Sequence, residues 1–172
     1  YESEYEITND DLIDSEYYDE FDDALIFDLG RITAWERSFM SSEKDADGEI
    51  WESFALKCAI TSFQTVDAAR QAVERYNDAE KPDSMLTLFN KELDLGDVNV
   101  IYRGGLVTAI EFSYRNVAVR IHYTEGQDLA ITELFARIVL EKLQKAPLAA
   151  PIESSIALPT NHEINSVDSR SE

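Results

Sequence analysis

The chain has 172 residues, of which 35 are acidic and 15 are Lys or Arg, so its net charge is −20. This charge repels phosphate, which disfavours nucleic acid and anionic lipid surfaces as partners and favours a protein partner with a basic surface. The single cysteine, Cys58, excludes an intrachain disulfide and an all-cysteine metal cluster. No run of about 18 apolar residues is present, so the sequence predicts no transmembrane segment.

Composition divides the chain into three parts. Residues 1–23 hold eleven acids and no Lys or Arg, and like charges at this density oppose compaction. They predict a flexible spacer, or a docking arm that folds on a basic partner through aromatic contacts at Tyr17, Tyr18 and Phe21. Residues 24–145 form the predicted domain, and residues 146–172 hold three prolines and predict a tail. The chain starts at Tyr1; a removed signal or lipid-anchored leader would account for this, and so would a trimmed chain.

The first half of the domain predicts a hairpin and a helix. Residues 32–40 and about 50–63 each alternate apolar and polar side chains, which is typical of half-buried strands, and the short segment between them predicts an antiparallel hairpin. Thr65 is a natural N-cap for a helix that runs to about residue 78. Residues 84–90 predict a short second helix or an apolar loop.

The second half predicts a three-stranded meander and a helix. Alternation marks strands at 98–102, 106–114 and 117–123, with a tight turn at Gly104-Gly105. The last helix covers about residues 127–144, with a broad apolar face and a favourable Glu133–Arg137 pair. The order ββ-α-βββ-α predicts an α+β fold: a five-stranded antiparallel sheet with two helices packed on one face, flanked by extended tails.

Two stretches resemble bacterial extracytoplasmic domains, namely lipoproteins and the external parts of sensor proteins. They are VNVIYRGGLVTAIEFSYRNVAVRIHY (98–123), which an amphipathic helix follows, and AITSFQTVDAARQAVERY (59–76). The likeness spans about residues 32–144. It implies a location outside the cytoplasm (periplasmic, cell-surface or secreted) and a binding or assembly role, with no shared catalytic residues.

One loop partly matches a calcium-binding pattern. Asp45, Asp47 and Glu49 occupy places of an EF-hand loop, with Gly48 at its sixth place. The twelfth place, which needs a bidentate Glu, is Phe54, and the flanks predict strands rather than helices. A solvated hairpin loop is therefore the favoured interpretation, and we expect no metal or cofactor.

Three other groups are candidates for chemistry. Cys58 lies on the apolar face of its strand, where burial makes a thiol inert. His122 lies on a strand face beside Arg120 and could titrate near neutral pH. Arg103, Arg115 and Arg120 could gather into a small anion clamp, or they could pair with neighbouring acids.

These features predict a non-catalytic protein. No nucleophile, base and orienting group can be placed together, so an enzyme is the least favoured function. We expect an extracytoplasmic accessory protein that docks on a larger assembly through residues 1–23 and 146–172. The alternative is a small-ligand-binding or sensing module, with a pocket on the sheet face away from the helices. The candidate lining of that pocket is Trp35, Trp51, Arg103, Arg115 and Arg120.

Overall fold

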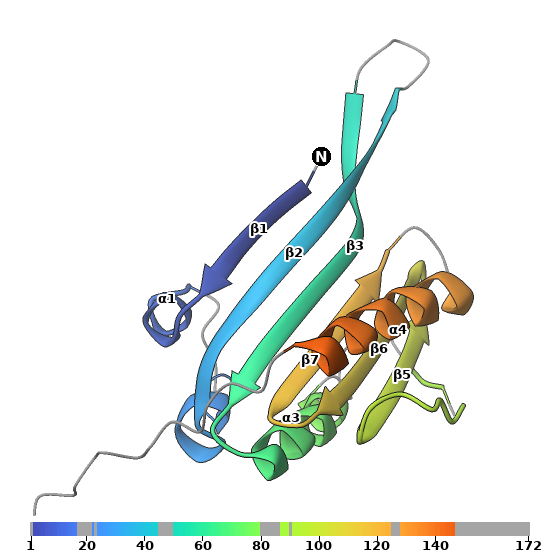
Figure 1. Ribbon diagram of the computed structural model, residues 1–172. Helices are drawn as coiled ribbons and strands as arrows, with labels where there is room; N and C mark the ends of the chain where they lie inside the picture. Colours follow the sequence, from blue (N-terminus) through green and yellow to red (C-terminus); the bar gives the residue numbers. More distant parts are fainter. Residues whose placement is uncertain are drawn as a thin grey trace, which may run out of the picture.

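The computed structural model describes residues 2–16, 22, 24–44, 50–79, 87–89, 91–124 and 128–146, and it shows an α+β fold built on one sheet (Figure 1). The strands are β1 (Glu2–Ile7), β2 (Arg31–Lys44), β3 (Ile50–Phe63), β4 (Thr87–Leu88), β5 (Val98–Gly104), β6 (Val107–Tyr114) and β7 (Val117–Tyr123). The helices are α1 (Asn9–Ile13), the π-helical turn η1 (Ala24–Asp28), α3 (Val66–Ala79) and α4 (Leu129–Lys145).

The sheet has seven strands in the order β1-β2-β3-β7-β6-β5-β4, and all neighbours are antiparallel. The predicted α+β class, the hairpin β2–β3 and the meander β5–β6–β7 are confirmed. The predicted number of five strands is wrong, because β1 and β4 add one strand at each edge. β4 lies where residues 84–90 had predicted a helix or a loop.

The N-terminal edge strand comes from the acidic segment, so that segment is not entirely an extended tail. β1 pairs with β2 from Glu2↔Phe39 to Ile7↔Ala34. The acids of β1 find partners on β2: Glu4 lies 3.8 Å from the Arg37 guanidinium, and Glu6 accepts a hydrogen bond of 2.8 Å from the Thr33 hydroxyl. These cross-strand contacts offset the like-charge repulsion that had predicted an open arm.

The hairpin β2–β3 is longer than the strands beside it. Its pairing runs from Lys44↔Ile50 to Arg31↔Phe63, with register irregularities between Arg31 and Thr33 and between Phe39 and Met40. The β3 strand pairs with β7 only through residues 56–62, and β1 covers only residues 34–39 of β2. The far part of the hairpin therefore projects beyond the rest of the sheet (Figure 1).

The two long helices cover opposite faces of the sheet. Val119 and Ile121 of β7 belong to the apolar cluster under α4. Ala118, the residue before Val119, belongs to the cluster under α3. Since neighbouring residues of a strand point to opposite faces, the prediction that both helices pack on one face is wrong. The reason is visible in β6, where every residue from Thr108 to Ser113 is buried, so the centre of the sheet is enclosed on both sides.

The helix α3 packs closely because its buried residues are small. Ala68, Ala69, Ala72 and Val73 are buried against the sheet. Thr65 caps the helix as predicted: its hydroxyl accepts a hydrogen bond of 3.1 Å from the backbone N–H of Ala68.

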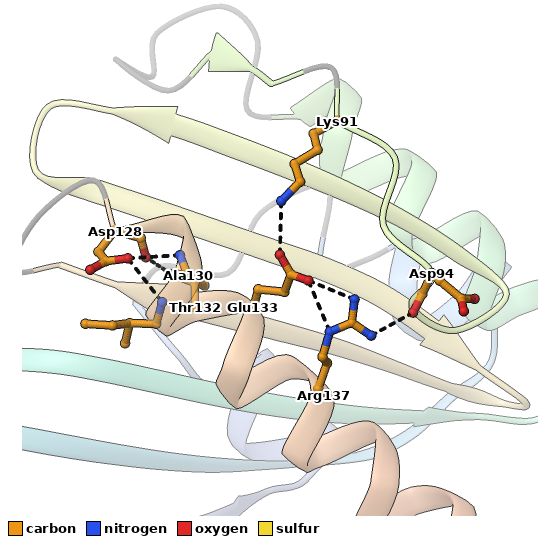
Figure 2. A network of polar contacts seen from close by, with 8 residues as sticks. Lys91, Asp94, Asp128, Ala130, Thr132, Glu133 and Arg137 are labelled. Atoms are coloured by element: carbon orange, nitrogen blue, oxygen red, sulfur yellow. Dashed lines mark hydrogen bonds and ion pairs between the residues drawn. The ribbon is translucent and has the colours of Figure 1, made fainter.

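A network of polar contacts fastens α4 to the segment before β5 (Figure 2). Glu133 accepts hydrogen bonds from Lys91 (3.1 Å) and from Arg137 (2.8 Å), and Arg137 also donates to the backbone carbonyl of Asp94 (3.3 Å). These cations lower the pKa of the Glu133 carboxyl, with Arg137 the larger cause. At the start of the helix, the Asp128 side chain caps the first turn.

Candidate functional site

A cavity of about 180 Å³ lies on the sheet face opposite α4, between the strands β2, β3 and β7 and the N-terminal segment. Its floor is made by side chains of the three strands: Ala34, Glu36, Lys57, Ala59, Thr61, Ala118, Arg120 and His122. Its wall comes from residues that precede or begin β2: Ile7, Leu12, Asp22, Leu25 and Arg31. The wall is far in the sequence from the parts of the floor that β3 and β7 supply, so only the folded chain creates this space.

The cavity exists because small residues stand between long ones on its floor. Across the sheet, Glu36 lies opposite Ala59, Ala59 lies opposite Arg120, and Arg120 lies opposite Glu111. Ala59 therefore leaves a hollow between the Glu36 and Arg120 side chains. Ala34, which lies two residues before Glu36 on the same face of β2, enlarges this hollow.

Two ion pairs stand on either side of Ala59. The Lys57 ammonium lies 2.8 Å from the Glu36 carboxylate, which keeps only 8% of its side chain exposed. The Arg120 Nε–H donates to Glu111 Oε1 at 2.6 Å, and the Glu111 side chain is 1% exposed. Buried charges of this kind need partners, because removing an ion from water is expensive.

The N-terminal segment is held over this floor by polar contacts. Arg31, which is buried, donates hydrogen bonds to the Asn9 side chain and to the Ile7 carbonyl (2.8 Å), and Asn9 donates in return to the Arg31 carbonyl (2.9 Å). The Tyr5 hydroxyl donates to Glu36, and this hydrogen bond raises the pKa of Tyr5 to about 12. These contacts tie both sides of the cavity together.

His122 points onto the same floor and is neutral at physiological pH. Burial lowers its pKa to about 3, and the neighbouring charges of Arg120 and Lys57 act in the same direction. Its Nε2 is buried and makes no hydrogen bond with the described residues. A histidine titrating near neutral pH, which the sequence had suggested, does not fit these surroundings.

We expect the free energy of unfolding to decrease as the pH is lowered, because of His122. Its pKa in the folded chain lies below the ordinary value of 6.5, so the unfolded chain binds the proton first. The free energy of unfolding should therefore decrease below pH 6.5 by up to about 1.4 kcal/mol per pH unit. Urea unfolding of the native chain and of His122→Gln between about pH 7 and pH 5 measures this loss.

The variant provides the control for this prediction. Over the window from about pH 7 to 5, the native chain should lose roughly 2 kcal/mol more than His122→Gln. Glu133 and Glu141, whose pKa values are also lowered, are present in both proteins, so their protonation cancels in this difference. Equal losses in the two proteins would show that His122 is accessible to protons in the folded state.

The three predicted arginines lie in three different places. Arg120 lines the cavity. The Arg103 guanidinium lies 5.0 Å from the centre of the Phe89 ring, on the edge formed by β4 and β5, and Arg115 lies 5.0 Å from the centre of the Tyr114 ring in the β6–β7 turn. The fold therefore does not bring them together as a clamp.

The other predicted contacts lie outside the cavity or outside the described residues. Trp35 is 46% exposed and lies on the α4 side of β2, since its neighbour Glu36 lines the cavity. Trp51 belongs to β3, and its side chain is not described. The remaining predicted positions lie outside the described residues: Tyr17, Tyr18, Phe21, Asp45, Asp47 and Glu49.

Among the residues that the structure describes, no group of three or more His, Cys, Asp or Glu side chains could hold a metal ion.

Cys58 lies on β3 in the apolar cluster under α4, on the face opposite the cavity. Burial raises the pKa of its thiol from 9.0 to about 11. At about pH 8 its thiolate fraction should be roughly 100-fold lower than in the unfolded chain. An aromatic disulfide reagent should therefore react with the folded protein at least that much more slowly than in urea, and equal rates would contradict the burial of the thiol.

The sequence alone did not identify Arg31, Glu36, Lys57 and Ala59 as site residues. Lys57, Ala59 and Thr61 read as the solvent face of a half-buried strand. The available signal was a pair of opposite charges, Glu36 and Lys57, on the polar faces of two strands that form a hairpin. That signal becomes a site only when side chains of the N-terminal part cover it, namely Ile7, Leu12, Asp22, Leu25 and Arg31.

Comparison with known proteins assigns the chain to no family. No protein-family model matches it, and no curated protein matches it. One similar solved structure is the extracellular domain of PknH from Mycobacterium tuberculosis, with 14% sequence identity and a TM-score of 0.49 over 84% of this chain and 79% of that chain. A likeness of this strength carries no conclusion about function. In the described parts of this chain, no helix combines the length and apolar character needed to span a bilayer.

Proposed function

We propose that this chain is a non-catalytic, extracytoplasmic binding module that holds a small molecule in the cavity between β2, β3, β7 and the N-terminal segment. The observation that carries the proposal is a hollow around Ala59 that two ion pairs flank, each with a buried carboxylate. The location outside the cytoplasm is the one that the sequence resemblance implies.

The charged floor favours a binding site over a structural core. Well-packed apolar residues often stabilise a protein as well as a buried ion pair does, or better. Here two pairs, each with a buried carboxylate, flank a space that is left unfilled, and His122, whose buried Nε2 has no described partner, also lines it. Ligand sites commonly combine an apolar lining with a few convergent polar groups, and this cavity has both.

The size of the cavity sets the size of the ligand. Pockets for drug-sized molecules hold roughly 300–1,000 Å³. At about 180 Å³ this cavity suits a molecule smaller than those.

Binding without turnover is the function that these groups support. Cys58, a potential nucleophile, lies on the opposite face of the sheet. His122 has a pKa of about 3, which is too low for efficient general acid–base catalysis near neutral pH. Detection of turnover of a bound compound by the purified chain would contradict this part of the proposal.

A library of small carboxylates, amines, sugars and nucleosides tests the proposal by ligand-observed NMR. At least one compound should bind the native chain. Ala59→Leu should abolish that binding, because the larger side chain fills the hollow. The matched control is Ala130→Leu, which adds the same atoms at an exposed position of α4.

Two results would reject this site. The first is that no compound of the library binds. The second is that a compound binds equally well to Ala59→Leu and to the native chain, provided that circular dichroism shows the variant folded. If Ala59→Leu does not fold, Ala59→Val replaces it as the test variant. This smaller change should cause an intermediate loss of binding if the cavity is the site.

Docking on a larger assembly is the second candidate function, and the position of β1 supports it. β1 is the terminal strand of the sheet, and its outer edge faces no other strand in the described part of the chain. Such an edge can accept a strand from another chain. Glu4 and Glu6 favour a basic partner, so Glu4→Gln/Glu6→Gln should reduce the mass of a particle purified gently from the native source. An unchanged particle would exclude docking through this edge.

A further inference from the structure

Three cationic side chains line the cavity of a strongly acidic chain, whose net charge is −20. Among the described residues, the charged lining consists of Arg31, Lys57 and Arg120 with Asp22 and Glu36, and Glu111 pairs with Arg120 beside the cavity. Cationic side chains gathered around one hollow can hold a negative group through charge-assisted hydrogen bonds.

Three donors converge on the hollow from two neighbouring strands. On β7, Arg120 and His122 point to the same face, and Lys57 of β3 lies directly opposite His122. Directly opposed residues have Cβ atoms about 4.5–5.5 Å apart, so all three side chains border the space above Ala59. Arg31 stands across from them in the wall, where its contacts to Asn9 and Ile7 fix it.

All three donors line the cavity. The Arg120 side chain is 28% exposed beside Glu111, and Lys57 is 46% exposed beside Glu36. Neutral His122 carries one ring proton, so its imidazole adds one N–H donor to this lining.

On the basis of the proposed function, we infer that the cavity takes a small molecule with one carboxylate group, which Arg120, Lys57 and His122 bind. A planar carboxylate matches the fork of a guanidinium. A phosphate carries about −1.5 to −2 near pH 7 and would meet repulsion from Glu36.

Matched pairs of compounds test the ligand class on the full chain by isothermal titration. The probes are propanoate against propanamide, butanoate against butanamide, inorganic phosphate and propylamine. Carboxylates should bind at least about 10-fold more tightly than their amides, since charge-assisted hydrogen bonds are the stronger ones. Phosphate and propylamine should bind more weakly than propanoate.

Two conservative variants test the donors. Arg120→Lys keeps the charge opposite Glu111 but removes the fork, and it should weaken propanoate binding about 10- to 100-fold. Lys57→Met should weaken it about 10-fold. The control is Arg70→Lys, an exposed position of α3 outside the cavity, which should leave binding unchanged. Thermal unfolding shows whether each variant is folded.

The outcomes separate this inference from the proposed function. If amides or propylamine bind as tightly as carboxylates, or if phosphate binds as tightly as propanoate, the ligand class is wrong while the cavity remains a binding site. If carboxylates bind but Arg120→Lys and Lys57→Met bind them equally well, the site is not this one. If none of these probes and no compound of the wider library binds, the proposed function fails as well.

Discussion

Arg120→Met should lower the free energy of unfolding by about 3–5 kcal/mol, because it leaves the Glu111 carboxylate buried without its cation. Glu111 is 1% exposed, and its Oε1 accepts from Arg120 at 2.6 Å. Urea unfolding of the native chain and the variant at neutral pH measures the loss. A loss below about 1 kcal/mol would mean that Glu111 is solvated or is protonated in the folded chain.

The double variant Arg120→Met/Glu111→Leu is the control for this result. Removing both charges together should be close to neutral, since apolar residues of similar size often replace a buried ion pair without loss. The summed losses of stability for Arg120→Met and Glu111→Leu as single variants should therefore greatly exceed the loss for the double variant. If the double variant instead loses the sum of the single effects, the two side chains do not interact.

Gly96→Ala should cost about 3 kcal/mol or more. Gly96 has a φ of +68°, and an added Cβ would lie 2.1 Å from the carbonyl oxygen of Ser113. That oxygen cannot move away, because it accepts a hydrogen bond of 2.7 Å from the backbone N–H of Asp97. The change in thermal or urea unfolding measures the effect.

Gly105→Ala is the matched control for the glycine. Gly105 has a similar φ of +55°, but an added Cβ would meet nothing within 4 Å. Its substitution should cost only the strain of the left-handed backbone, about 1–2 kcal/mol. Equal effects at the two glycines would show that close approach to β6 is not what requires Gly96.

The elements that could be predicted from the sequence are those whose pattern is local. The hairpin, the meander and the long helices follow from alternation and helical spacing within single segments, and the Thr65 cap and the Glu133–Arg137 pair follow from spacings of three and four residues. In each case the interacting residues are close together in the chain, so the pattern contains the structure.

The edge strands and the helix faces depend on distant residues. β1 forms because Glu4 and Glu6 meet side chains of β2 about thirty residues away, which no local pattern in an acidic segment reveals. β6 carries Glu111 on one face and apolar residues on the other, which suggested one covered face. The Arg120 partner allows this acid to be buried under a second layer instead.

The candidate site depends on distant residues in the same way. Arg120 was singled out from the sequence, but with Arg103 and Arg115, which the fold places elsewhere. Two charged residues that line the cavity with it, Lys57 and Glu36, come from strands whose polar faces indicated exposure to solvent. Burial of His122 follows from the same cover and explains why its pKa falls rather than staying near neutral.

The most direct test of ligand binding in this cavity is a chemical-shift map of the isotopically labelled full chain titrated with the small-molecule library. At least one compound, a carboxylate, should shift the signals of Ala59 and of the His122 ring in a saturable manner. The exposed face of α4 around Leu134, which is 58% exposed, should stay unchanged. If no compound shifts Ala59 or His122, or if the shifts centre on α4, the cavity is not a ligand site and the account is wrong.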